Sequence, residues 1–138
     1  MLKDWGNQRR RKELLVGPTA TIFLPKPVSE QLLVILDSEL RSAVSKIETS
    51  RKGRNWDIWM ASESTGFTHP FHVHILETSE RLEDCGSLLE ELALDSSVFQ
   101  AFVTVSAGCN ESEDWNLTEV LAKMIADRFG GITTKAGK

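Results

Sequence analysis

Alternating apolar and polar positions predict four main β-strands in the chain. Residues 19–24 (TATIFL) are rich in β-branched and aromatic side chains and lie between two prolines. Further strands are expected at 56–61, 71–76 and 99–105, and a short one at 132–135. In the second and third strands every other residue is apolar, so each strand has one face toward a core.

Apolar residues at three- and four-residue steps predict three helices. The first is expected to begin after Ser29, which can act as its N-cap, and to run to about residue 48. The second is expected over 79–94. The third opens at Asn116, which with Glu119 is close to a capping box, and ends where Gly130 can adopt the left-handed conformation. Residues 49–55 are expected to form a polar, basic loop.

The predicted order β-α-β-β-α-β-α-β indicates an α+β protein with a mixed or antiparallel sheet and helices packed on it. The first six elements match a ferredoxin-like core, to which one helix and an edge strand are added. Residues 1–13 lack apolar periodicity and are expected to form a flexible basic arm. Residues 14–138 are expected to form a single domain.

Charge is unevenly distributed along the 138 residues, whose net charge is −4. Residues 1–16 hold five basic and two acidic groups, so the remainder holds 11 basic and 18 acidic groups, net −7. An acidic body repels phosphates and attracts basic proteins, so we expect a protein partner and no nucleic acid. The sequence has no membrane-spanning apolar run and no secretory signal, so a cytoplasmic protein without a membrane partner is expected.

Acidic residues concentrate in 77–95, where seven carboxylates accompany one arginine. Helical geometry places most of them opposite the apolar stripe of the second helix, and a second acidic stretch precedes the third helix. This pattern is typical of a solvated helix face or of a docking surface for a basic protein. Two tryptophans extend the candidate surface. The candidate partner-binding residues are Glu80, Glu83, Asp84, Glu90, Glu91, Glu111, Glu113, Asp114, Trp59 and Trp115.

Catalytic and metal chemistry have weaker support. His72 and His74 alternate with apolar residues, which explains them as the outer face of a strand. Since they lie about 7 Å apart on one side, they can also chelate a metal ion, with His69 as a third ligand. Cys109 follows a strand and can in principle act as a nucleophile beside a histidine, but a tight turn at Gly108 is the favoured explanation of the segment. We therefore expect no enzyme and no cofactor, with a histidine-based metal enzyme as the less favoured alternative.

Two segments carry a resemblance to known proteins. Residues 17–25 (GPTATIFLP) and 126–131 (ADRFGG) are similar to those of an uncharacterised family of small bacterial α+β proteins. That family broadly resembles the immunity proteins encoded beside polymorphic or contact-dependent toxins. The likeness covers about residues 16–133 and implies a non-catalytic immunity protein that neutralises a basic, nuclease-like toxin domain. Another protein-interaction or regulatory domain is the alternative.

Overall fold

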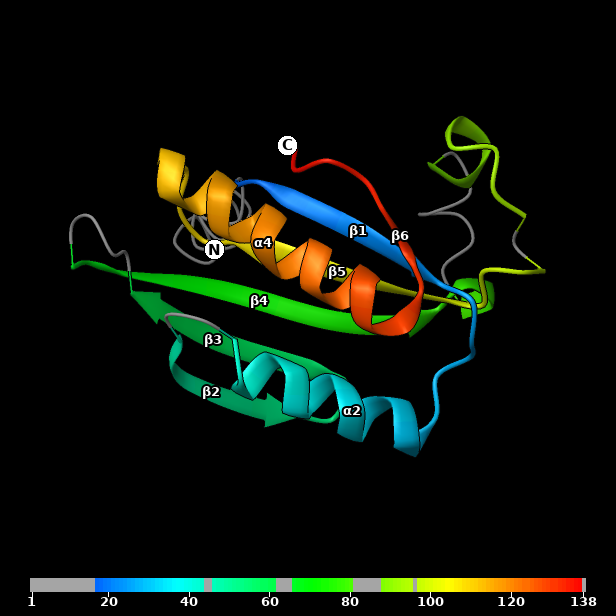
Figure 1. The fold of residues 1–138 in the computed structure, drawn as a ribbon, viewed down its shortest axis with the longest axis horizontal. Coiled ribbons are helices and arrows are strands. Elements are labelled where there is room, and N and C mark those ends of the chain that lie inside the picture. The colour runs from blue at the N-terminus through cyan, green and yellow to red at the C-terminus, as the bar shows by residue number, and fades with distance from the viewer. Residues whose placement is uncertain (1–16, 44–45, 62–65, 81–87, 96, 138) are drawn as a thin grey trace, which may run out of the picture.

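The computed structural model describes residues 17–43, 46–61, 66–80, 88–95 and 97–137. It is an α+β structure in which three consecutive strands, β2 to β4, stand between helix α2 and the later elements (Figure 1). In chain order these elements are β1 (Thr19–Leu24), α2 (Glu30–Arg41), β2 (Lys46–Lys52), β3 (Asn55–Ala61), β4 (Thr68–Glu77), the 3-10 helix η1 (Thr78–Glu80), β5 (Ala101–Ala107), α4 (Ser112–Phe129) and β6 (Ile132–Thr133).

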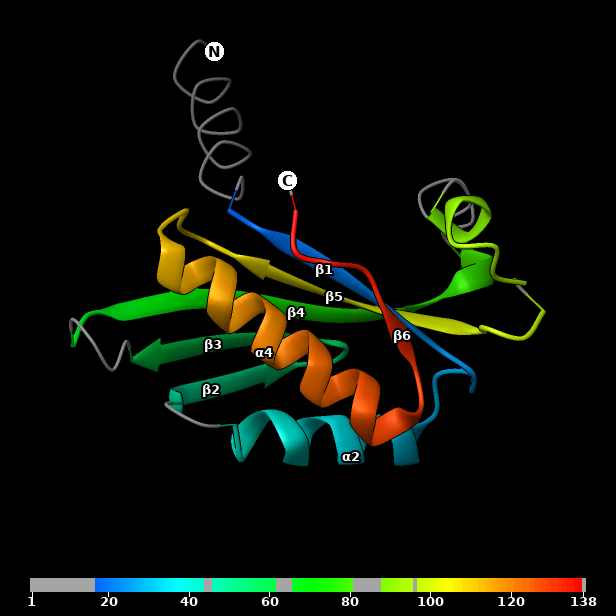
Figure 2. The same ribbon diagram turned by 45° about the horizontal axis from the view of Figure 1, so that its top comes forward.

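The six strands form one sheet in the order β2-β3-β4-β5-β1-β6, and every neighbouring pair is antiparallel. The helices α2 and α4 lie on the same face of this sheet, α2 over β2 and β3 and α4 over β1 and β5 (Figure 2). The predicted α+β class and the helix-covered sheet are therefore confirmed.

The strand order differs from the ferredoxin-like arrangement predicted above. Such a core contains two units in which a helix joins parallel strands around one intervening strand. Among the elements that the structure describes, only β5, α4 and β6 form such a unit, around β1. The other helix, α2, joins β1 to β2 across three strands, because β5 pairs directly with β4 and separates it from β1.

The prediction for residues 42–55 is wrong. Helix α2 ends at Arg41 rather than near residue 48, and the expected basic loop is mostly the edge strand β2. Ile47, assigned to the apolar stripe of the helix, is 54% exposed. Pairing of β2 with β3 provides hydrogen-bond partners for the backbone here. This tertiary interaction outweighs the helical pattern of apolar residues, which is weak at the end of the predicted helix.

Helix α4 begins four residues before the predicted start. Its N-terminal hydrogen bond runs from the Glu111 backbone N–H to Asp114 Oδ2 at 2.9 Å, not between Asn116 and Glu119. At the other end Gly130 has φ 66° and caps the helix in the left-handed conformation, as predicted. No helix in the described ranges is long and apolar enough to cross a membrane.

Side chains of the strands form two cores on opposite faces of the sheet. The larger core lies under α2 and α4 and contains alternate residues of β1, β3, β4 and β5. The smaller core, Phe23, Leu89 and Phe102, covers one end of the other face. The rest of that face carries exposed or half-buried side chains, most of them polar, and we call it the open face. The expected helix over 79–94 falls partly outside the described residues. Within it, Leu89 is buried as predicted and Leu92 is 37% exposed.

Candidate functional site

Two histidine–aspartate pairs lie on β4, one on each face of the sheet. On the covered face, His69 Nδ1 lies 2.9 Å from Asp114 Oδ1 on α4. The His69 residue is 7% exposed and Asp114 is fully buried. Because Nδ1 faces a carboxylate, we assign the ring proton to this nitrogen.

Asp114 also organises the first turn of α4. Its second carboxylate oxygen accepts the Glu111 backbone N–H, and its backbone carbonyl accepts the Thr118 hydroxyl at 2.6 Å. The prediction that Asp114 belongs to an exposed partner-binding surface is therefore wrong. The local sequence does not indicate this role, because a run of acidic residues is typical of a solvent-exposed segment. The burial of Asp114 depends on His69, which is far away in the sequence.

The chemistry around the buried pair does not support an activated nucleophile. His69 Nε2 has no hydrogen-bond partner among the described residues and is closed to solvent. Cys109, in the loop before α4, is exposed and carries a free thiol. Burial raises the pKa of this thiol, and the nearby carboxylates of Asp114 and Glu111 raise the pKa further. The thiol therefore stays protonated at neutral pH.

The second pair lies on the open face. His72 Nδ1 is 3.1 Å from Asp57 Oδ1, and His72 Nε2 is 3.2 Å from Asn55 Oδ1. The His72 side chain is 37% exposed, and its ring centroid lies 5.8 Å from that of His74. The outward direction predicted for His72 and His74 is confirmed. The contacts with Asp57 and Asn55 orient the imidazole of His72.

The three histidines do not form one site. His69 points to the covered face, whereas His72 and His74 point to the open face, so the sheet itself separates them. The alternative ligand set His69, His72 and His74 is therefore wrong. Within the ranges that the structure describes, no three His, Cys, Asp or Glu side chains lie close enough together to hold a metal ion.

Residues that pair between neighbouring strands form three rows of side chains across the open face. Trp59, at 43% exposure, is the large aromatic side chain on this face, and its indole points away from Trp56, Ile58 and Met60 as predicted. A hollow of about 570 Å³ lies at the β2–β3 turn. The rows are Glu48–Trp59–Pro70, Ser50–Asp57–His72–Ser106–Thr19 and Lys52–Asn55–His74–Thr104–Thr21.

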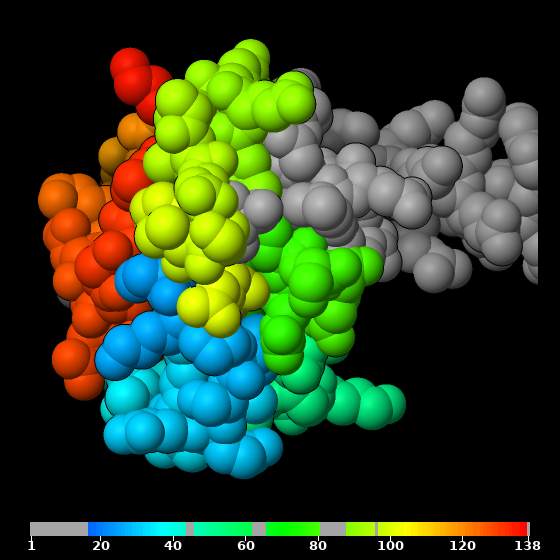
Figure 3. Space-filling model, turned by 90° about the vertical axis from the view of Figure 1, so that its right-hand side faces the viewer, coloured from blue at the N-terminus to red at the C-terminus, as the bar shows by residue number. Residues whose placement is uncertain are grey.

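The predicted acidic surface is only partly described. Glu90 and Glu91 are exposed, while Glu83 and Asp84 lie outside the described residues. Glu80 is exposed but already bound, because it pairs with Arg54 at 3.1 Å and accepts the Glu77 backbone N–H. Figure 3 shows the segment that contains these two residues, in yellow-green, on the surface at this end of the molecule.

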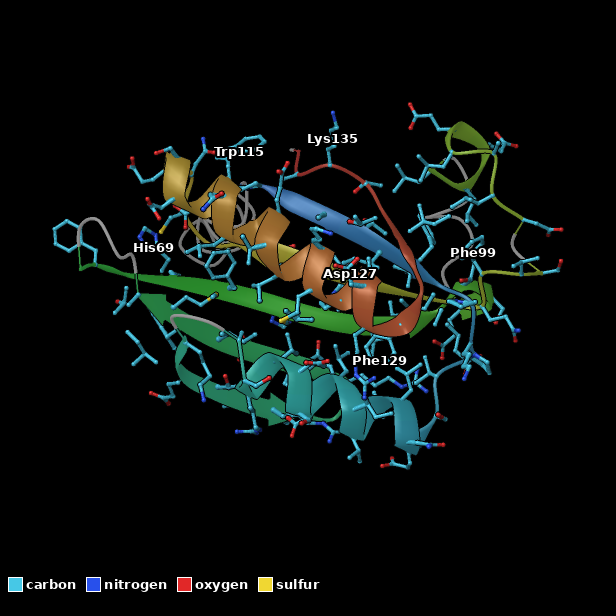
Figure 4. All side chains as sticks on the ribbon, in the orientation of Figure 1. His69, Phe99, Trp115, Asp127, Phe129 and Lys135 are labelled. Carbon is cyan, nitrogen blue, oxygen red and sulfur yellow. The ribbon has the colours of Figure 1, made fainter. Side chains whose placement is uncertain are left out.

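The two acidic stretches lie at opposite ends of the molecule. Phe99, next to the first stretch, and Trp115, next to the second, lie at the two ends of the sheet (Figure 4). The strand β5 runs between them, and its seven residues span about 20 Å. Glu111 is exposed at the second end, and Glu113 and Trp115 are partly buried. The predicted partner-binding residues therefore do not form one patch.

Sequence reasoning missed the apolar part of the first acidic stretch. Leu92 is 37% exposed although its position predicted an inward side chain, and Val98 is 50% exposed. Both lie within residues 88–99, which we call the acidic segment; residue 96 lies outside the description. Leu89 in this segment packs against Phe23 and Phe102. The sequence did hold one signal: the apolar stripe predicted for this helix has several members, whereas Leu89 alone is buried among the described ones.

Trp115 is held by its own loop. Its indole Nε1 donates to Asn110 Oδ1 at 2.8 Å. This hydrogen bond joins the first turn of α4 to the loop that precedes it, so the side chain has a structural contact at a half-buried position.

Comparison with known proteins identifies a family. The model of a family of unknown function (DUF6368) matches residues 16–137. No curated protein and no solved structure matches the chain.

Proposed function

We propose a function for this chain, which belongs to the DUF6368 family of unknown function. It is a non-catalytic immunity protein of the cytoplasm that binds a basic toxin domain through its acidic segment and neutralises that domain. The observation that carries this proposal is the combination of exposed apolar and exposed acidic side chains on residues 88–99.

The acidic segment has the composition of a protein-binding surface. Leu92 and Val98 offer apolar side chains to a partner, and the exposed carboxylates of Glu90, Glu91 and Asp95 accompany them. Interfaces commonly have an apolar centre that partners bury and a polar rim that solvent still reaches. Carboxylates at the rim accelerate the encounter with a basic partner, and those nearer the centre slow dissociation.

Hydrogen bonds within the acidic segment hold its shape. Leu94 N donates to the Leu89 carbonyl at 2.8 Å, and the residue between the helical turn and this bond, Ala93, has a positive φ of 56°. Asp95 accepts the backbone N–H and the hydroxyl of Ser97, and these bonds lower the pKa of Asp95. A surface ordered before binding loses less conformational entropy when a partner docks.

The experiment begins with the genes on either side of the one that encodes this chain and asks whether one of them encodes a secreted protein with a basic C-terminal domain. That domain is then expressed in cells, and growth is measured. Co-expression of this chain is expected to restore growth. Glu90→Lys/Glu91→Lys is expected to abolish protection and to weaken binding to that domain by at least about tenfold. Both positions are exposed, so the circular dichroism spectrum should not change.

The matched control is Glu48→Lys/Glu119→Lys. Both residues are exposed, lie outside the acidic segment and change the net charge by the same amount. This control should protect as well as the unmodified chain. Equal loss in both double variants would mean that overall charge matters rather than the segment, and protection by Glu90→Lys/Glu91→Lys would contradict the proposal.

A further inference from the structure

We propose that the open face binds the basic stretch at residues 9–12 of this same chain, with a cationic side chain over Trp59 and beside the carboxylates of Glu48 and Asp57. The structure describes the chain from Gly17 onward, so this occupant precedes the described residues. The inference concerns a different surface from the acidic segment and does not rest on the proposed function. While the contact lasts, it covers Trp59 and closes the open face to other ligands.

The open face and the N-terminal segment carry opposite charges. The three rows of side chains on this face hold the carboxylates of Glu48 and Asp57 against the one amine of Lys52. At the β2–β3 turn, Arg54 and Glu80 pair at 3.1 Å and offset each other's charge. The segment before the described structure holds five basic and two acidic groups, and four of the basic groups are consecutive. Charge complementarity therefore favours contact between the two.

The carboxylates of this face lie beside its tryptophan. Trp59, at 43% exposure, pairs with the exposed Glu48 on β2, and Asp57 lies two positions earlier on the same face of β3. A cationic side chain over an indole gains cation–π attraction, and adjacent carboxylates add charge-assisted hydrogen bonds. A contact of this kind exists on the covered side of β3, where the Arg51 guanidinium lies 5.4 Å from the ring centroid of Trp56. The open face offers the same chemistry to an arginine or lysine from outside the sheet.

The N-terminal segment joins the described structure in line with Trp59. Trp59 pairs with Pro70, and the Pro70 carbonyl accepts the backbone N–H of Gly108 at 2.9 Å. Gly17 lies next to Gly108, because a Cβ at Gly17 would meet the carbonyl oxygens on both sides of Gly108. Three strand spacings, about 14 Å, thus separate Gly17 from Trp59. Lys12 precedes Gly17 by five residues, which reach about 17 Å, so the basic stretch is long enough to lie over Trp59.

The route from Gly17 to Trp59 is also low on the surface. Gly17 and Gly108 have no side chain, and a Cβ at Gly108 would lie 2.9 Å from Pro70 Cγ. The acidic segment is the competing surface, but it lies beyond the far end of β5, about 20 Å away. A short linker gives an effective concentration in the millimolar range, so even a contact whose Kd as a separate peptide is about 1 mM is formed in a large share of molecules.

The first test compares the full chain with a full-length variant, the neutralised variant, in which glutamine replaces the four basic residues at 9–12. The NMR signals of the Trp59 indole N–H and the His72 ring report on the open face, and Trp59→Phe assigns the indole signal. These signals should differ between the two proteins at about 10 mM salt and converge at about 1 M, because the Debye length falls from about 30 Å to about 3 Å. The indole N–H of Trp115, which is bound to Asn110, should be the same in both proteins.

The second test uses the neutralised variant as the receptor for a labelled synthetic peptide of residues 1–16, followed by fluorescence anisotropy. Trp59→Ala in this variant should weaken peptide binding about two- to fivefold, which corresponds to the loss of one exposed cation–π contact. Glu48→Gln/Asp57→Asn should weaken it about three- to tenfold. The matched control is the exposed pair in the acidic segment: replacing both carboxylates at 90 and 91 by glutamine should leave peptide affinity unchanged.

Identical Trp59 and His72 signals in the full chain and the neutralised variant would overturn the proposal. An equal loss of peptide binding in the acidic-segment control would overturn it too, because the contact would then follow overall charge. If the signal difference grows with protein concentration, the basic stretch of a second copy occupies the face, and the contact within one chain is wrong. Thermal unfolding of each variant distinguishes a lost contact from a lost fold, since Trp59 is exposed and its replacement should leave the fold intact.

Discussion

The two histidine–aspartate pairs on β4 have the same chemistry and nearly the same length. His69 and Asp114 lie 2.9 Å apart, with side chains 9% and 0% exposed, while His72 and Asp57 lie 3.1 Å apart, with side chains 37% and 72% exposed. Three positions along one strand place the first pair under α4 and the second in solvent.

Burial decides what each pair can do. On the covered face the loss of one partner leaves a desolvated polar group, so the pair contributes strongly to the fold. On the open face water replaces either partner, so the pair contributes little to stability and remains available to a ligand. The covered pair therefore contributes to the stability of the fold, and the exposed pair can be altered at little structural cost.

Removal of the buried carboxylate should have the largest effect. Asp114→Ala removes the partner of His69 and the acceptor of the Glu111 backbone N–H together. The free energy of unfolding should fall by about 3 kcal/mol, and the melting temperature by roughly 10 °C. Urea and thermal unfolding measure both quantities. The matched variant Asp57→Ala should change the free energy by less than about 0.5 kcal/mol. Similar losses in the two variants would contradict the comparison.

A third carboxylate should extend the comparison to acid pH. Asp37 on α2 accepts the indole N–H of Trp56 at 2.9 Å and pairs with Arg41. Burial alone raises the pKa of Asp37, but hydrogen bonds from Trp56 and Arg41 and the charges of Arg41 and Arg51 more than offset it. The pKa of Asp37 therefore lies below its ordinary value.

The sign of the pH effect follows from that lowered pKa. The stabilisation from Asp37 is complete above the pKa of the unfolded chain, about 4, and is lost as the pH falls through the lower folded value. Asp37→Asn should therefore lower the free energy of unfolding by about 1 kcal/mol at neutral pH. Below about pH 4 the free energies of unfolding of the variant and the unmodified chain should become more alike. Urea unfolding at several pH values measures this difference. A constant difference across the range would show that Asp37 does not contribute to acid sensitivity.

His72→Ala should have the smallest effect on stability. The residue is half exposed on an open sheet face, so the free energy of unfolding should change by no more than about 0.5 kcal/mol. A large loss of stability would place His72 among the structural residues and remove the distinction between the two faces.

The sequence predicted which side chains share a face of each strand better than it predicted which strands pair with each other. Alternation in β3 and β4 placed Trp59, His72 and His74 outward correctly, because a two-residue period is a property of each strand alone. The edge strand β2 has no apolar period, since only pairing with β3 defines it, so it was mistaken for helix and loop. The strand order likewise depends on contacts between β4 and β5 that local patterns do not encode.

The site was predictable to a similar extent. Glu90 and Glu91 face solvent as their helical positions indicated. Asp114 was misassigned because its partner, His69, is 45 residues away in sequence, and an acidic run gives no sign that one member is buried. The exposure of Leu92 could not be predicted for the same reason. Periodicity shows which residues lie on the same side of a helix, but not whether the neighbouring strands are long enough to cover that side.

Parallel double-mutant cycles on the two pairs test the division between the faces most directly. One cycle uses His69→Ala and Asp114→Ala, the other uses His72→Ala and Asp57→Ala, and urea unfolding gives the coupling free energy of each pair. The structure predicts a coupling above about 1.5 kcal/mol for the buried pair and below about 0.5 kcal/mol for the exposed pair. Equal couplings, or a larger one on the open face, would contradict the claim that burial makes the covered pair structural and leaves the exposed pair with little effect on stability.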